Sequence, residues 1–137
     1  MSENDFPQLL HTALDARDVR REAEFWRQYL GLQYRPGDEI PEGEDTADWL
    51  VLTSADGTRR LAIQEATELI PTTWPRPDVP MQLHLDFTVT DFAALERHRD
   101  RALELGATLI LDRSDDPDEA LYVLGDPEGH PFCIFVA

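Results

Sequence analysis

Two histidines stand at matching places in two similar stretches of the chain. His11 in LHTALDARD is followed seven residues later by Asp18, and His84 in LHLDFTVTD is followed seven residues later by Asp91. The second pair lies 73 positions after the first, since 84 − 11 and 91 − 18 give the same number. Imidazole nitrogens are common ligands of transition metals. The spacing therefore indicates either a metal site or the trace of a duplicated structural unit.

Each histidine belongs to a segment with the pattern of a strand followed by a capped helix. Alternation of apolar and polar residues predicts strands over 8–16 and 81–89. Aspartate is a favourable N-cap, and glycine commonly ends a helix because it adopts the left-handed conformation. The expected helices and their caps are 19–30 between Asp18 and Gly31, and 92–105 between Asp91 and Gly106.

Short strands are expected after each helix, so each half has the order β-α-β-β-β. The Asp56-Gly57 pair is a strong signal for a hairpin between two of these strands. Recurrence of the whole pattern indicates a repeated supersecondary unit. We predict one α+β domain over 1–137, with module one at 7–67, a proline-rich crossover at 68–80 and module two at 81–137. The further expected strands span 32–35, 48–54, 59–66, 108–114, 119–126 and 131–137.

The composition favours a single acidic globular domain. The 137 residues include 28 acidic and 12 basic side chains, for a net charge of −16, and every basic residue is Arg. Such a surface repels phosphate backbones and anionic lipid, so nucleic-acid and membrane partners are not expected. The sequence has no apolar run of about 20 residues and no signal-peptide pattern, which predicts a cytoplasmic protein. Cys133 is the one cysteine, so no disulfide can form within the chain.

The residues around the two histidines predict a polar face on each first strand. Side chains two positions apart point to the same face of a strand. His11 therefore shares a face with Asp15. In the second module, His84 shares a face with Asp86. If helices cover the other faces, two curved sheets placed side by side make a cup in which His11 and His84 face each other, a suitable site for a small molecule.

Three stretches, EFWRQYLGLQY, HLDFTVTD and LGDPEGHPFCIFVA, together with the doubled β-α-β-β-β order, resemble the vicinal oxygen chelate superfamily. That group includes glyoxalases, bleomycin resistance proteins, fosfomycin-modifying enzymes and extradiol dioxygenases. The resemblance covers nearly the whole chain. It is closest to glyoxalase-like domain proteins of high-GC bacteria, in keeping with the use of Arg in place of Lys. It implies tandem βαβββ modules that form cupped mixed sheets, and a homodimer, but no particular substrate.

The resemblance also implies where a metal would be bound. Metal-dependent members hold a divalent ion with side chains from the first, fourth, fifth and eighth strands, and His11 and His84 match the first and fifth. On the eighth strand, Cys133 stands where a glutamate is expected. On the fourth, Ala62 takes the ligand position, with Gln64 next on the same face. We therefore predict no complete metal site and no cofactor; the alternative is a divalent metal bound with the help of Cys133 or Gln64.

Other polar and aromatic side chains complete the predicted ligand site. His84 and Asp86 could act as a general acid–base pair or hold a polar ligand group, the alternative being a solvated polar face. Trp49 and Gln64 lie on strands that could line the cup. No catalytic residue is assigned. The predicted binding residues are His11, Trp49, Gln64, His84, Asp86 and Cys133.

These features predict a protein that binds a small organic molecule in the cup between its sheets. One version is a drug-sequestering resistance-type protein, for which the negative charge favours a cationic ligand. An alternative is a metal-dependent lyase, isomerase or dioxygenase that uses His11 and His84. A further alternative is a metal-free isomerase or hydrolase that relies on His84 and Asp86.

Overall fold

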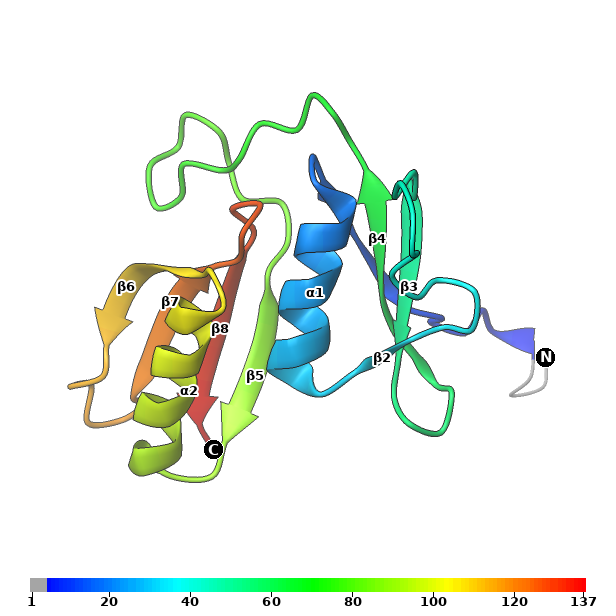
Figure 1. Cartoon of the computed structure of the whole chain (residues 1–137). Helices are drawn as coiled ribbons and strands as arrows, with labels where there is room; N and C mark the ends of the chain where they lie inside the picture. Colours follow the sequence, from blue (N-terminus) through cyan, green and yellow to red (C-terminus); the bar gives the residue numbers. More distant parts are fainter. Residues whose placement is uncertain (1–4) are drawn as a thin grey trace.

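The computed structural model describes residues 5–137 and contains the two predicted modules, which are joined by a crossover that passes above both (Figure 1). Each module has one helix and a four-stranded sheet. In chain order the elements are β1 (Thr12–Ala16), α1 (Val19–Leu30), β2 (Gln33–Tyr34), β3 (Trp49–Thr53), β4 (Arg59–Glu65), β5 (Leu85–Val89), α2 (Phe92–Glu104), β6 (Thr108–Arg113), β7 (Leu121–Gly125) and β8 (Pro131–Val136).

The two helices begin at the predicted aspartates. The Asp18 side chain accepts a hydrogen bond from the backbone N–H of Arg21 at 3.1 Å, and Asp91 accepts one from Ala94 at 2.8 Å. Each bond satisfies a backbone donor that the first turn of a helix otherwise leaves free. Gly31 ends α1 in the left-handed conformation, with φ of 67°. The predicted caps of α1 and the predicted start of α2 are therefore confirmed.

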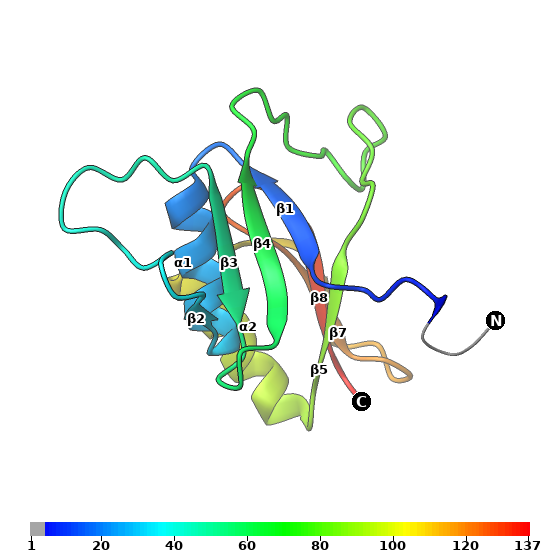
Figure 2. The same ribbon diagram turned by 90° about the vertical axis from the view of Figure 1, so that its right-hand side faces the viewer.

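The two sheets have the same topology (Figure 2 shows the first of them face on). Their strand orders are β1-β4-β3-β2 and β5-β8-β7-β6, with parallel pairing of β1 to β4 and of β5 to β8 and antiparallel pairing elsewhere. Both sheets are thus mixed, and the predicted α+β class is confirmed. The first strand of each module lies at a sheet edge, so β1 and β5 each have one unpaired side.

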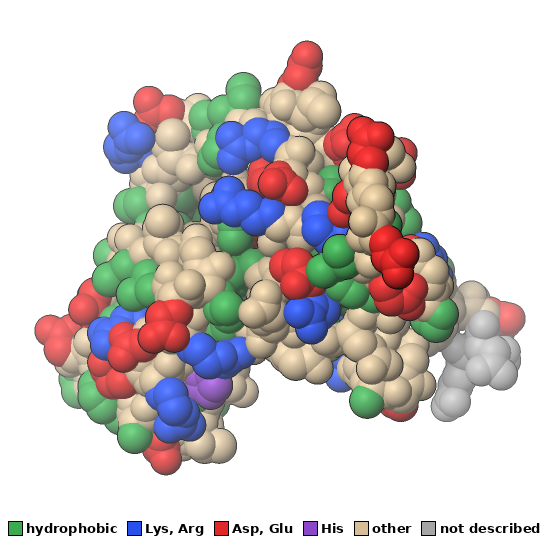
Figure 3. All heavy atoms as spheres, in the orientation of Figure 1, with side chains coloured by type: hydrophobic (Ala, Val, Ile, Leu, Met, Phe, Trp, Pro, Cys, Tyr) green, Lys and Arg blue, Asp and Glu red, His purple; other side chains and the backbone are tan. Residues whose placement is uncertain are grey.

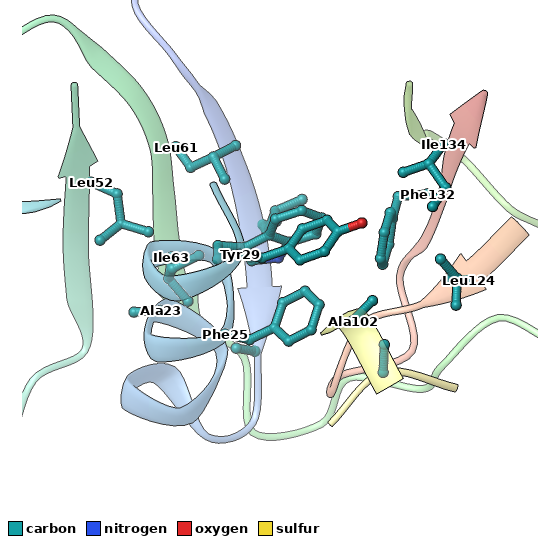
Figure 4. Close-up of a cluster of buried hydrophobic side chains, with 14 of the residues drawn as sticks. Ala23, Phe25, Tyr29, Leu52, Leu61, Ile63, Ala102, Leu124, Phe132 and Ile134 are labelled. Atoms are coloured by element: carbon teal, nitrogen blue, oxygen red, sulfur yellow. The ribbon is translucent and has the colours of Figure 1, made fainter. Parts of the chain in front are cut away.

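Helix α1 lies between the two sheets and forms a core that belongs to both modules (Figure 4). The Trp26 ring centroid lies 5.0 Å from that of Phe132 on β8 and 5.6 Å from that of Phe87 on β5. Phe25 and Tyr29 point to the same side (Figure 4). The first sheet packs on the helix through Leu50, Leu52, Leu61 and Ile63, and the second contributes Tyr122, Leu124, Phe132 and Ile134 to the same cluster.

Two predicted strand beginnings are wrong. The β1 ladder begins at the pair of Thr12 and Leu61, next to an irregularity in the pairing of β3 with β4. The β5 ladder begins at Leu85, because its partner β8 starts at Pro131, which has no N–H to donate. His11 and His84 therefore lie just before their strands. Leu10 and Leu83, which precede these strands, are exposed, and so is Phe92 at the start of α2.

The outer surface carries the acidic character of the sequence. Figure 3 shows acidic side chains scattered over one side of the molecule with Arg side chains among them. No helix in 5–137 is both long enough and apolar enough to span a bilayer.

Candidate functional site

A cavity of about 290 Å³ lies where the two modules meet, beneath the crossover. The crossover runs from the end of β4 to the start of β5 (Figure 1). The cavity walls are mainly apolar and come from both modules. The lining residues are Ala13, Leu14, Asp15, Trp26, Leu69, Ile70, Pro71, Thr72, Val79, Pro80, Met81, Gln82, Leu83, His84, Leu85, His130 and Pro131.

Three ionisable side chains line this cavity from different parts of the chain. Asp15 comes from β1, His84 precedes β5, and His130 precedes β8. The Asp15 carboxylate accepts a hydrogen bond from Gln64 Nε2 at 3.2 Å. His130 Nε2 donates to the backbone carbonyl of Asp15 at 2.6 Å and so fixes the imidazole beside β1. An apolar cavity with a few polar groups in fixed positions is typical of a site for a small organic molecule.

The crossover is seated on the β7–β8 turn by a close contact. Gly129 has φ of +93°, and a Cβ at this position would lie 2.8 Å from Pro71 Cβ. The loop itself is tied by Thr72 Oγ1, which donates to the carbonyl of Val79 at 2.6 Å. The roof of the cavity therefore has a defined position relative to its floor.

Replacing Gly129 with alanine is expected to lower the free energy of unfolding by about 2–3 kcal/mol, because the residue would be strained and Pro71 would have to move. Gly57→Ala is the matched control, since Gly57 has φ of +88° and open space around it. The Gly57→Ala variant has only the backbone strain of a positive φ, which should lower its free energy of unfolding by about 1–2 kcal/mol. Urea denaturation of both variants measures the difference. An equal loss of stability in the two variants would contradict a close contact between the crossover and Gly129.

A second group of polar side chains lies on the open face of the second sheet, away from the helices. His84 Nε2 is 3.3 Å from Asp86 Oδ1, and Asp86 pairs across the ladder with Cys133. One potential ligand atom from each of these three residues lies within 4.8 Å of the others. His84 and Asp86 are exposed, whereas Cys133 is half-buried. The sequence prediction that His84 and Asp86 share a face is therefore confirmed, with His84 just outside the strand.

The Cys133 thiol is not activated. Burial, followed by the nearby Asp86 carboxylate, raises the pKa of Cys133 to about 11. The side chain is then a neutral thiol at neutral pH, and the thiolate is the form that attacks electrophiles and binds metals. The surroundings of Cys133 favour neither role.

His11 lies on the open face of the first sheet. Its ring centroid is 5.7 Å from that of Trp49. Burial, followed by the positive charges of Arg59 and Arg35, lowers the pKa of His11. The imidazole is therefore neutral at physiological pH. Trp49 and His11 together form a half-buried aromatic pair beside two guanidinium groups.

The structure does not bring the two histidines of the sequence repeat together. His84 groups with Asp86 and Cys133, and within 5–137 His11 does not join that group. Because α1 lies between the sheets, their open faces point away from each other in one chain. The four-strand donor set that the resemblance implies for a metal does not fit these residues. Gln64 instead donates a hydrogen bond to the carboxylate of Asp15, which lines the cavity.

The cavity residues Asp15, Trp26 and His130 were missed as site residues by the sequence analysis. Trp26 lies in the core with an exposure of 1%, and it also borders the cavity. The proline-rich crossover (68–80) is the sequence feature that could have indicated a site here. A segment of 13 residues between two modules has to pass over the place where the modules meet.

Comparison with known proteins supports the fold. A family model described as a glyoxalase-like domain matches residues 11–135. None of the curated proteins compared with the chain matches it. A glyoxalase/bleomycin resistance protein/dioxygenase family enzyme from Burkholderia phytofirmans PsJN has a similar structure, with a TM-score of 0.66, 22% identity, and coverage of 93% of this chain and 96% of that one.

Two further solved structures are similar. The fosfomycin resistance protein FosX from Listeria monocytogenes gives a TM-score of 0.67 at 14% identity, with 96% of this chain and 94% of that chain covered. A glyoxalase/dioxygenase from Nostoc punctiforme gives 0.64 at 21% identity, with 99% and 94% covered. At these identities the likeness establishes the fold, and the substrates of these proteins do not transfer.

Proposed function

We propose that this chain, which belongs to the glyoxalase-like domain family of the vicinal oxygen chelate superfamily, binds a small organic molecule in the cavity between its modules. The observation that carries the proposal is the cavity of about 290 Å³ with mainly apolar walls and three ionisable side chains from separate parts of the chain. Its volume is at the lower end of the range for small-molecule sites, roughly 300–1,000 Å³.

The charge of the site favours an organic amine. Among the described residues that line the cavity, Asp15 has the one carboxylate, and Lys and Arg are missing from the lining. The whole chain carries a net charge of −16, which raises the local concentration of cations. An ammonium group near Asp15, with an apolar body against Trp26 and Leu69, would use both features of the cavity.

We also propose that the chain forms a homodimer. β1 and β5 both have an unpaired edge, and the segments that lead into them expose large apolar side chains. Leu9 is 90% exposed and Leu83 is 59% exposed. A second copy could cover these residues and place the open face of one module opposite that of another. Such pairing is the arrangement in which His11 and His84 could share a cup.

A thermal-shift screen with matched amine and acid pairs tests the proposed ligand class. Tryptamine with indole-3-acetate, and 2-phenylethylamine with phenylacetate, keep the ring and change the charge. We expect amines to raise the Tm in a saturable manner and acids to have little effect. Asp15→Asn is expected to reduce the preference for amines, because the anionic group is lost while the hydrogen-bonding capacity remains.

Two tryptophan variants locate the binding site. Ala13 is exposed and lines the cavity, so Ala13→Trp is expected to block it without entering the core. Ala55, exposed in the β3–β4 turn, gives the control Ala55→Trp, which should bind as the natural sequence does. A Tm shift that persists in Ala13→Trp, or no shift with any organic probe, would overturn the proposal. Catalysis by His84 and Asp86 stays a prediction.

A further inference from the structure

Besides Glu128, which is paired with Arg17, two further carboxylic acids are buried where the modules meet, apart from the open face that carries His84 and Cys133. Glu22 belongs to α1 and is 0% exposed, and Asp126 belongs to the β7–β8 turn and is 3% exposed. Trp26 Nε1 donates to Asp126 Oδ2 at 3.1 Å and lies 3.4 Å from Glu22 Oε2. The two side chains therefore converge on one indole N–H.

One oxygen of this pair has no partner. Asp126 Oδ1 accepts hydrogen bonds from the backbone N–H groups of Glu128 at 3.0 Å and His130 at 2.9 Å. Glu22 Oε1 is buried and receives no hydrogen bond from any described residue. A buried acceptor without a donor is costly, and native structures contain few of them.

The charge of the pair is also not balanced by the protein. Within residues 5–137, no ion pair involves Glu22 or Asp126, and the nearby Arg17 is paired with Glu128 at 3.0 Å. Burying two carboxylates without a cation is unfavourable, so the pair must take up either a proton or a positive ion. Burial, followed by the adjacent Asp126, raises the pKa of Glu22, so the proton is taken up when no ion is present.

His130 supplies a third group of the kind that metals prefer. Its Nε2 donates to the Asp15 carbonyl at 2.6 Å, which leaves Nδ1 as an acceptor. A ring N–H held by a backbone carbonyl is the usual support of a metal-binding histidine. One potential ligand atom each from Glu22, Asp126 and His130 lies within 4.8 Å of the others.

We propose that Glu22, Asp126 and His130 form a binding site for one divalent transition-metal ion of the Zn²⁺ or Mn²⁺ class. Two carboxylates and an imidazole suit these ions, and the two negative charges match the charge of the ion. Trp26 and His130 also line the cavity, which provides a path for the ion. Binding joins α1 of module one to the β7–β8 turn of module two.

Calorimetric titration of the chelator-treated full chain with ZnCl₂ and with MnCl₂ tests the site. At least one of the two ions is expected to bind with a stoichiometry of one per chain and to raise the Tm. Glu22→Gln is expected to weaken binding at least tenfold.

Matched variants separate this site from the group on the open face. His84→Ala should bind the ion as the natural sequence does, and His130→Gln should bind it weakly. Failure of both ions to bind stoichiometrically, equal binding by Glu22→Gln, or loss of binding in His84→Ala would overturn the proposal. The organic-ligand screen gives an independent result, because the Ala13→Trp variant leaves these three residues unchanged.

Discussion

Replacing Trp26 with alanine is expected to lower the free energy of unfolding by about 4 kcal/mol, since removing a large buried aromatic side chain typically costs about 3–5 kcal/mol. Trp26 is 1% exposed and packs against Phe132 and Phe87 of the second module. Its N–H is also a donor to the buried Asp126 carboxylate. The variant therefore leaves a cavity and removes a hydrogen bond at the junction of the modules.

Two controls separate these effects. Trp26→Phe keeps an aromatic ring but has no N–H, so it should lose roughly half as much stability, because Asp126 Oδ2 loses the donor that Trp26 provides. Trp49→Ala removes a half-buried tryptophan on the open face and should cost less than Trp26→Ala. Urea denaturation followed by circular dichroism measures all three. A loss below about 1 kcal/mol in Trp26→Ala would contradict the shared core.

Replacing Glu22 with glutamine is expected to stabilise the metal-free protein increasingly as the pH rises. Burial, followed by the Asp126 carboxylate and then Glu128, raises the pKa of Glu22 above its usual 4.5. The folded chain must therefore hold a proton that the unfolded chain releases. The stability contributed by this proton is complete below pH 4.5 and declines as the pH rises towards the folded-state pKa.

The size of the effect follows from proton linkage. A proton held only in the folded state lowers stability by up to about 1.4 kcal/mol per pH unit, so the advantage of the variant over the natural sequence should grow as the pH rises from 5 to 8. The introduced glutamine keeps the shape of the side chain and can donate to Asp126. Urea denaturation of both proteins in the presence of a chelator at pH 5, 6.5 and 8 measures this difference in stability. A difference between the two proteins that does not change with pH would show that Glu22 does not carry this proton.

The local elements could be predicted from the sequence because their signals are local. Asp18, Asp91 and Gly31 mark helix ends through bonds and dihedral angles that depend on a few neighbouring residues. The doubled order of elements then indicated the fold. The beginnings of β1 and β5 could not be found in this way, since they depend on partner strands. Pro131, which is distant in sequence, determines where the β5 ladder starts.

The site was less predictable because it depends on how the modules are placed. Alternation placed His84 and Asp86 on one face correctly. It could not show that α1 lies between the sheets and separates His11 from His84 in one chain. The cavity and the buried acids arise at the contact between modules. Glu22 in particular has the sequence context of an ordinary polar position on an amphipathic helix, although it is fully buried.

A crystal structure of the chain with the amine that gives the largest Tm shift tests the central claim most directly. The ligand is expected beneath the crossover, with its ammonium group hydrogen-bonded to the Asp15 carboxylate and its apolar part against Trp26 and Leu69. A ligand bound on the open face around His84 and Cys133, with the cavity between the modules left empty, would contradict the account.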